Sequence, residues 1–313
     1  MTIRIAFVGA GNMAREHCKA FSDIPDVSIV GVFSRTRSRA EDLAAEFSID
    51  HVYSSVDELW AGTNADIVII TVRELGTREV CRSAFRFPWL CLIEKPAGYD
   101  LHDAEFILDE SKRSNARAFV LLNRRHYAST RSVLKALENS SEQRIVQIMD
   151  QENPQVALEH GEDPLVAKNW MYANSIHVID YLKVFCRGDV TDVNHVIPWN
   201  SEHPYFVFVT LAFSSGDVGL YQAIWNGPGP WSVSISTRTR RFEMRPLEQA
   251  TVQPHKSRKS EVLEGHEWDV KFKPGLRLQA EEALKALKCL DHQLPSLEEG
   301  FETMRLIKVI YAN

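Results

Sequence analysis

The chain has 313 residues, a formal net charge of −6 and a hydrophobic fraction of 44%. The length favours about two domains, and the acidic balance argues against general binding to nucleic acid or to an anionic membrane. No apolar run reaches the roughly 20 residues that span a bilayer. Five scattered cysteines, with no C-x-x-C pair, favour reduced thiols. With no signal-peptide pattern at the start, we expect a cytoplasmic protein. The histidines show no paired ligand spacing, so no metal site is expected.

A glycine-rich turn follows the first apolar run. The range 3–8 predicts a strand and the range 12–22 a helix, and between them Gly9, Gly11 and Ala14 form a G-x-G-x-x-A pattern. There the first glycine permits a sharp turn, the second lets a pyrophosphate approach the backbone, and the alanine lets the helix lie close to the strand. The free amides and dipole of the helix then bind phosphate. A purely structural tight turn is the alternative. The predicted phosphate-binding residues are Gly9, Gly11, Asn12 and Met13.

Strands and helices alternate through the first part of the chain. Further strands are predicted at 27–33, 52–53, 65–72, 90–93 and 118–122, and helices at 38–47 and 56–59. Each strand is apolar on both faces, which is typical of a parallel sheet covered by helices on both sides. We therefore predict an α/β, doubly wound Rossmann domain over residues 1–122.

The pattern changes after this point. Strands are predicted at 144–151, 190–197, 205–213, 218–225 and 232–237, and helices at 130–137, 174–185, 276–290 and 297–311. Turn residues between the long β-rich runs favour antiparallel hairpins. We expect residues 123–313 to form an α+β domain with one large, mostly antiparallel open sheet. The polar range 248–265 is interpreted as a surface loop or an edge strand.

The end of the second strand bears on the choice of dinucleotide. An acidic residue about 20 residues beyond the glycines would bind the adenosine ribose of NAD. The sequence has Ser34, Arg35, Thr36 and Arg37 there instead. Hydroxyl and guanidinium donors suit a 2′-phosphate, so NADP is favoured over NAD. The alternatives are a solvated basic turn, or an Arg35 that stacks on the adenine of either cofactor.

The tripeptide Glu94-Lys95-Pro96 follows the fifth strand. The carboxyl ends of strands in such a sheet form the ligand crevice. A lysine there can hydrogen-bond a substrate hydroxyl and ease the loss of its proton. The alternative is a surface salt bridge before a turn proline.

These features resemble the Gfo/Idh/MocA family of sugar-type oxidoreductases over nearly the whole chain. Besides the glycine turn, Glu94-Lys95-Pro96 occupies the family's E-K-P position, and Asn123-Arg124-Arg125 its N-x-R region. The resemblance implies that Lys95 contacts the reacting oxygen and that the Lys95–Pro96 peptide is cis. It also implies a homodimer or homotetramer formed through the open sheet. The predicted cofactor-binding residues beyond the glycine turn are Ser34, Arg35, Thr71, Val72, Arg73, Glu94, Lys95 and Asn123.

The family also carries a D-x-x-x-H pair on a helix over the nicotinamide. His177 matches the histidine, but Ala173 stands where the acid belongs. Asn174 and Tyr181 could share a helix face with His177. Asn174 cannot move a proton but can orient a hydroxyl, so proton transfer falls to His177, assisted by Lys95. Alone, His177 would be interpreted as a structural histidine. Asp180 either orients the imidazole or faces solvent.

Several cations suggest an anionic substrate such as a nucleotide sugar, a sugar phosphate or an acidic sugar. The alternative is that they hold the cofactor phosphates and the domain interface. The predicted catalytic residues are Lys95 and His177, and the predicted substrate-binding residues are Asn174, Tyr181, Arg124 and Trp170. The hypothesis is an NAD(P)-dependent oxidoreductase for a carbohydrate-type alcohol or ketone. The competing hypothesis, motivated by Ala173, is a non-catalytic NAD(P)-binding regulator or scaffold.

Overall fold

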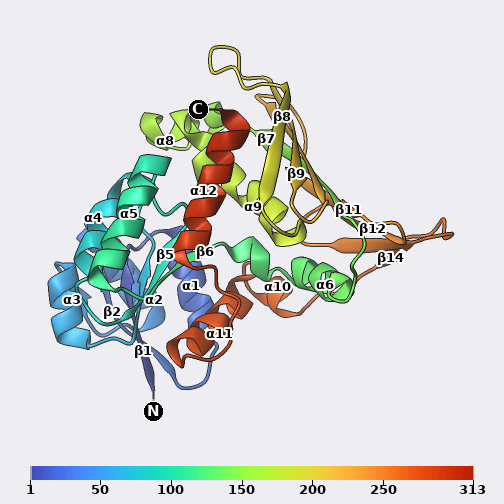
Figure 1. Ribbon diagram of the computed structural model, residues 1–313. Coiled ribbons are helices and arrows are strands. Elements are labelled where there is room, and N and C mark those ends of the chain that lie inside the picture. The colour runs from blue at the N-terminus through green and yellow to red at the C-terminus, as the bar shows by residue number, and fades with distance from the viewer. Residues whose placement is uncertain (1, 313) are drawn as a thin grey trace. The chain divides into compact units, whose positions relative to one another are not determined.

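The computed structural model describes residues 2–312, which divide into two compact units (Figure 1). Within the described residues, the first unit comprises residues 2–123 and 270–301, and the second comprises residues 124–269 and 302–312. The break near residue 123 lies where the change of pattern was noted. The range 270–301 differs from expectation, because it belongs to the first unit and not to the second.

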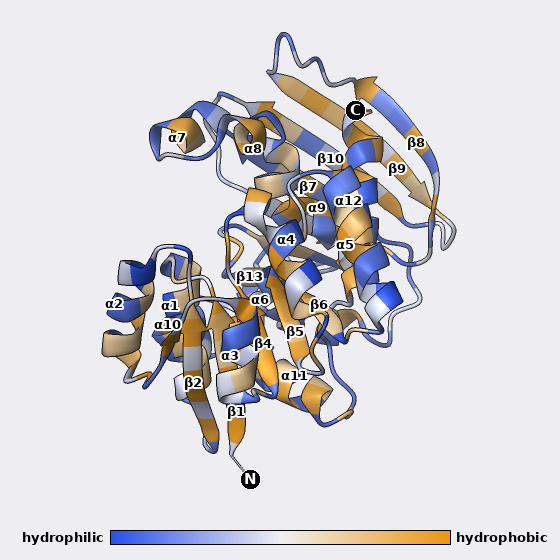
Figure 2. Ribbon diagram, turned by 90° about the vertical axis from the view of Figure 1, so that its left-hand side faces the viewer, coloured by the Kyte–Doolittle hydropathy of each residue, from blue (hydrophilic) through white to orange (hydrophobic). Residues whose placement is uncertain are grey.

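The first unit is built on a six-stranded parallel sheet in the order β3-β2-β1-β4-β5-β6. Its strands are β1 (Ile3–Val8), β2 (Val27–Phe33), β3 (Val52–Tyr53), β4 (Ile67–Ile70), β5 (Leu90–Glu94) and β6 (Ala118–Leu121). The strands are strongly hydrophobic (Figure 2), and every residue of β4 is buried. The strand order reverses between β1 and β4, where such sheets bind ligands. The prediction of a doubly wound domain is therefore confirmed.

Five helices connect these strands, and they differ in whether a side chain caps the N-terminus. They are α1 (Asn12–Ser22), α2 (Arg37–Phe47), α3 (Val56–Thr63), α4 (Glu74–Ala84) and α5 (Leu101–Ser114). The side chains of Ser55 and Asp100 cap α3 and α5 by accepting a backbone hydrogen bond. Helix α1 has Gly11 at this position and no side-chain cap, so its first amides remain available to a ligand.

The segment that returns to the first unit contains α11 (Leu276–Leu287) and the first turn of α12 (Leu297–Tyr311). The apolar face of α11, with Leu276 and Ala280, is buried in the same core cluster as Phe21 of α1. Arg277 lies 2.9 Å from a carboxylate oxygen of Asp23, at the end of α1. Burial of this apolar face explains why the helix joins the Rossmann unit.

The second unit contains an eight-stranded sheet in the order β14-β13-β12-β11-β7-β10-β9-β8. Its strands are β7 (Ile145–Glu152), β8 (Val190–Ile197), β9 (Phe206–Phe213), β10 (Val218–Trp225), β11 (Ser232–Ser236), β12 (Arg240–Met244), β13 (Ala250–Pro254) and β14 (Glu261–Val262). Among the described strands of this second sheet, only the β7–β10 pair is parallel. The expected large, mostly antiparallel sheet is confirmed, and β13 and β14 lie in the range 248–265.

The remaining helical segments include several that the sequence analysis did not predict. They are η1 (Asn123–His126), α6 (Ala128–Leu137), α7 (Pro154–Glu159), α8 (Pro164–Lys168), the π-helical turn η2 (Met171–Ser175), α9 (Ile176–Phe185) and α10 (Trp268–Lys271). Helix α9 packs against β7, whose alternate residues are buried. No helix within residues 2–312 combines the length and apolar character required to cross a membrane.

Candidate functional site

The glycine turn of the first unit has the geometry that its pattern predicts. Gly9 adopts a φ of +105°, and a Cβ atom built on it would lie 2.4 Å from the carbonyl oxygen of Thr71. A Cβ atom on Gly11 would meet nothing within 4 Å, and Ala14 is fully buried. Gly9 is thus required by the protein itself, whereas Gly11 borders open space that a ligand can enter.

The start of α1 suits an anion. Its first turn carries no acidic residue and no side-chain cap, so its amides and dipole can stabilise a phosphate. The amine of Lys273, on the returning segment, lies 3.2 Å from the sulfur of Met13 and adds a cation beside this turn. The residues present therefore fit the pyrophosphate of a dinucleotide. Sequence reasoning missed Lys273 because it is 260 residues from the turn.

Other predicted cofactor residues lie at the same edge of the sheet. A Cβ atom on Gly76 would lie 3.7 Å from Nη2 of Arg35 and 3.9 Å from the Val72 side chain, which places the ends of β2 and β4 together. The Thr71 hydroxyl donates to the carbonyl of Val8 at 3.3 Å. Ser34 follows β2 directly, and Arg73 precedes α4 as its N-terminal cap.

Glu94 and Asn123, both predicted to bind the cofactor, form hydrogen bonds with other residues of the first unit. His17 Nε2 lies 2.6 Å from Glu94 Oε1, and the Lys95 amide donates to Glu94 Oε2 at 3.2 Å. The Asn123 amide nitrogen donates to the Pro274 carbonyl at 3.1 Å. The contacts of Glu94 hold the chain next to Lys95, and the predicted cis Lys95–Pro96 peptide is confirmed. His17, a buried residue of α1, was not identified from the sequence.

In the second unit, His177 lies in the first turn of α9 and is 8% exposed. Its ring faces Trp231, with ring centroids 6.2 Å apart. The Arg124 guanidinium lies 4.6 Å from the centroid of the same indole, a cation–π distance. Trp231 thus joins two predicted site residues, and its own N–H donates to the Gln151 carbonyl at 3.1 Å. Its sequence position, in a Gly/Pro-rich loop before β11, gave no signal of this role.

Asn174 and Trp170, both predicted to bind substrate, line one cavity of about 480 Å³ in the second unit. The π-helical turn η2 carries Asn174 immediately before α9. The Asn174 amide nitrogen donates to Glu152 Oε2, at the end of β7, at 2.9 Å. Ala173 is buried beside it.

The structure contradicts the role predicted for Tyr181. Its hydroxyl lies 3.0 Å from the Thr130 hydroxyl and 3.3 Å from the Arg124 carbonyl, and its ring stacks on Phe185. The side chain is fully buried, and burial raises the pKa of its phenol. Tyr181 therefore packs inside the second unit and is not among the residues that line the cavity of Asn174 and Trp170. Its helical spacing from His177 was correct, but its orientation is inward.

Asp180 neither orients the imidazole nor faces solvent. It is buried and makes two hydrogen bonds with Arg125, at 2.7 and 2.8 Å, and accepts one from Thr303 at 2.9 Å. A bidentate pair of this kind is a strong, oriented contact. Asp180 thus joins η1 to α9 and to the middle of α12.

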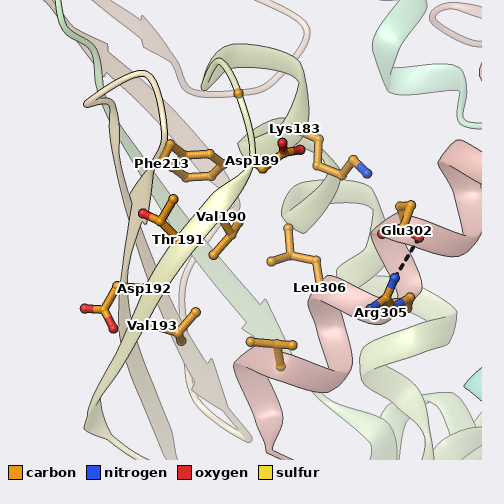
Figure 3. A pocket seen from close by; sticks show the side chains of 12 residues that line it. Lys183, Asp189, Val190, Thr191, Asp192, Val193, Phe213, Glu302, Arg305 and Leu306 are labelled. Atoms are coloured by element: carbon orange, nitrogen blue, oxygen red, sulfur yellow. Dashed lines mark hydrogen bonds and ion pairs between the residues drawn. The ribbon is translucent and has the colours of Figure 1, made fainter.

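A separate hollow of about 550 Å³ lies between β8 and the second half of α12 (Figure 3). Apolar side chains such as Val190 and Leu306 line it together with charged ones, and Arg305 pairs with Glu302 at 3.0 Å. The hollow contains none of the predicted site residues. Within residues 2–312, no group of three or more His, Cys, Asp or Glu side chains is arranged to hold a metal ion.

Two acidic residues of β7 were also missed. Asp150 and Glu152 are buried. Burial raises the pKa of both carboxyls, and the neighbouring Asp150 raises that of Glu152 further. They occupy inward positions of a strand whose other inward residues are Val146 and Ile148. Acidic residues at the inward positions of an alternating strand pattern are unusual, and this feature is visible in the sequence alone.

Comparisons with known proteins agree with this geometry. Residues 3–122 match the model of an oxidoreductase family with an NAD-binding Rossmann fold. Glucose-6-phosphate 3-dehydrogenase of Bacillus subtilis is 30% identical over 134 residues, which cover 43% of this chain and 37% of the relative. Myo-inositol 2-dehydrogenase of Thermotoga maritima is 21% identical over 139 residues, or 44% and 42% of the two chains. This chain thus spans about two fifths of the length of these curated relatives.

The fold is shared over a longer stretch. UDP-N-acetylglucosamine 3-dehydrogenase of Acidithiobacillus ferrooxidans superimposes with a TM-score of 0.79 at 17% identity, covering 100% of this chain and 97% of that one. The likeness therefore extends through both units. The Rossmann unit, over residues 3–122, is thus similar to that of the Gfo/Idh/MocA family of oxidoreductases.

Proposed function

We propose that this protein transfers hydride between the nicotinamide of NAD(P) and a carbohydrate-type alcohol or ketone. The observation that carries the proposal is the glycine turn, whose Gly11 borders open space at an uncapped helix start. In the oxidation direction, the C–H bond gives its hydride to the nicotinamide and the hydroxyl gives up its proton, so that a carbonyl forms. The names of the relatives, which are sugar and inositol dehydrogenases, support this class.

Lys95 and His177 divide the acid–base work in this proposal. The Lys95 ammonium stabilises the oxygen as it loses its proton, and His177 accepts the proton. Histidine suits the task because its ordinary pKa lies near neutrality. The contacts of Glu94 hold the loop of Lys95, and Trp231 packs against the His177 ring.

NADP is the proposed dinucleotide. Arg35 follows β2 and reaches the neighbourhood of Gly76 in α4, and a guanidinium there suits a 2′-phosphate. Arg124, held over Trp231, would bring a positive charge to a phosphate or carboxylate of the substrate. Assembly through the open sheet as a homodimer or homotetramer belongs to the same proposal.

The test is turnover of NADP⁺ and NAD⁺ with glucose 6-phosphate, myo-inositol and UDP-N-acetylglucosamine, followed by nicotinamide absorbance. We expect the wild type to reduce a dinucleotide with at least one of them. Lys95→Ala and His177→Ala should each lower turnover by about 10²-fold or more and retain dinucleotide binding. Lys112→Ala, which removes an exposed lysine that pairs with Glu298, is the control. A wild type that binds NADP but oxidises none of these sugars would instead favour the regulator hypothesis.

A further inference from the structure

A carboxyl pair lies beneath the cavity that Asn174 and Trp170 line. Asp150 and Glu152 are two residues apart on the inward face of β7, at 0% and 1% exposure. Glu152 also lines the cavity itself. No arginine, lysine or histidine of the described chain forms an ion pair with either carboxyl. Two neighbouring carboxylates cannot both remain ionised in such a place, so the pair retains a proton.

The hydrogen bonds of Asp150 indicate where that proton resides. The Tyr221 hydroxyl donates to Asp150 Oδ2 at 2.6 Å and lies 2.8 Å from the Tyr311 hydroxyl. Asp150 Oδ1 is buried and receives no hydrogen bond from the N–H and O–H donors of residues 2–312. A proton on Glu152 supplies that missing donor. Burial raises the pKa of both carboxyls, and that of Glu152 well above its ordinary value.

Glu152 in turn determines how the Asn174 amide is oriented. The Asn174 Nδ2 donates to Glu152 Oε2 at 2.9 Å, and the Ser175 hydroxyl donates to Oε1 at 3.3 Å. A flipped amide would place two oxygens against each other without a donor between them. The favoured orientation turns the Asn174 carbonyl oxygen, an acceptor, away from Glu152.

We propose that Glu152, protonated beside Asp150, is a positioning residue that fixes Asn174 so that Asn174 Oδ1 accepts a hydrogen bond from a substrate hydroxyl in the cavity. The proposal rests on the function proposed above. The hydroxyl in question is a different one from the hydroxyl that would give up its proton at Lys95 and His177. The site therefore selects a polyol with a second hydroxyl group, because an ether or carbonyl there would leave Asn174 Oδ1 without a donor.

Three variants separate the parts of this proposal. Glu152→Gln keeps an oxygen for Asn174 and supplies an N–H for Asp150, so it reproduces the protonated acid. Glu152→Ala removes both contacts. Glu159→Gln neutralises an exposed acid of α7 and is the matched control for a loss of one negative charge.

The first readout is the pH dependence of thermal unfolding, which needs no substrate. The raised pKa means that the folded state holds a proton that the unfolded state releases above the ordinary value of 4.5. Wild-type stability is therefore fully present below that pH and falls as pH rises towards the folded-state pKa. Glu152→Gln lacks this loss, so its melting temperature should rise relative to wild type with increasing pH. The Glu159→Gln control should show no such trend. A difference between Glu152→Gln and wild type that does not change with pH would overturn the proposal.

The second readout is the split between KM and kcat for myo-inositol. Glu152→Gln should keep KM within about twofold of wild type, whereas Glu152→Ala should raise it about tenfold or more with a smaller change in kcat. An unchanged KM in a folded Glu152→Ala protein would contradict the positioning role. If the wild type oxidises no sugar at all, the proposed function fails, and the unfolding experiment alone decides whether Glu152 is protonated.

Discussion

Gly9 and Gly11 have different roles in the turn: the fold requires Gly9, whereas cofactor binding requires Gly11. Gly11 has φ −88° and ψ −168°, an extended conformation that alanine adopts readily. A Cβ atom there meets no protein atom within 4 Å. Gly11→Ala should therefore not destabilise the fold by more than about 0.5 kcal/mol. Because alanine restricts the unfolded chain more than glycine does, the free energy of unfolding could even rise by about 0.4–1 kcal/mol.

Dinucleotide binding should respond very differently to the same methyl group. The methyl would occupy the space through which the pyrophosphate approaches the backbone. Overpacking of this kind costs about 1–3 kcal/mol, which corresponds to a rise of about 5- to 150-fold in Kd. The expected result is thus a stable protein that has lost most of its affinity for NADP.

Gly9→Ala is the matched comparison, because there the protein itself requires glycine. The φ of +105° is strained for alanine, at a cost of about 1–3 kcal/mol, and the new Cβ would lie 2.4 Å from the Thr71 carbonyl oxygen. This variant should lose stability as well as affinity. Urea unfolding measures the stability of both variants, and fluorescence titration with NADPH measures the affinity. A Gly11→Ala protein that binds NADPH like the wild type would refute the assignment of the turn.

Two further predictions concern single side chains. Tyr181→Phe should lower the free energy of unfolding by about 0.5–1.5 kcal/mol, because the buried hydroxyl bonds Thr130, and a changed substrate KM would contradict its structural role. Arg35→Ala should weaken NADP binding by about 10-fold or more, since hydrogen bonds to a charged group contribute about 1.5–3 kcal/mol, without weakening NAD binding. An equal loss of affinity for both cofactors in isothermal titration would instead support stacking on adenine.

The Rossmann unit was largely predictable because its signals are local. An apolar run such as Ile3–Val8 and the turn at Gly9 each specify their own conformation, and their order specifies a parallel sheet. The return of α11 to this unit was not predictable in the same way. Its amphipathic pattern shows that one face is buried, but a helix pattern does not identify the partner, here α1 with Phe21.

In the candidate site, too, some residues could be predicted from local motifs and others only from contacts between distant parts of the chain. Lys95 and His177 were predicted from motifs, whereas Trp231 and Lys273 are found only from their contacts with residues far away in the chain. Tyr181 shows the limit of spacing arguments. Its position on the helix was correct, but which way the side chain faces depends on α6 and its Thr130.

The acid of the D-x-x-x-H motif is absent from this chain, but another acidic residue, Glu152, lies close to the same helix. Ala173 is buried, and no charge is available four residues before His177. Instead, Glu152 reaches Asn174 from the neighbouring strand. An ionised acid next to His177 would raise the pKa of the imidazole by stabilising its charged form. A neutral amide hydrogen-bonded to a protonated acid adds no negative charge at that place. The proposed function therefore does not depend on an acid at position 173, because Lys95 and His177 are both present in the sequence.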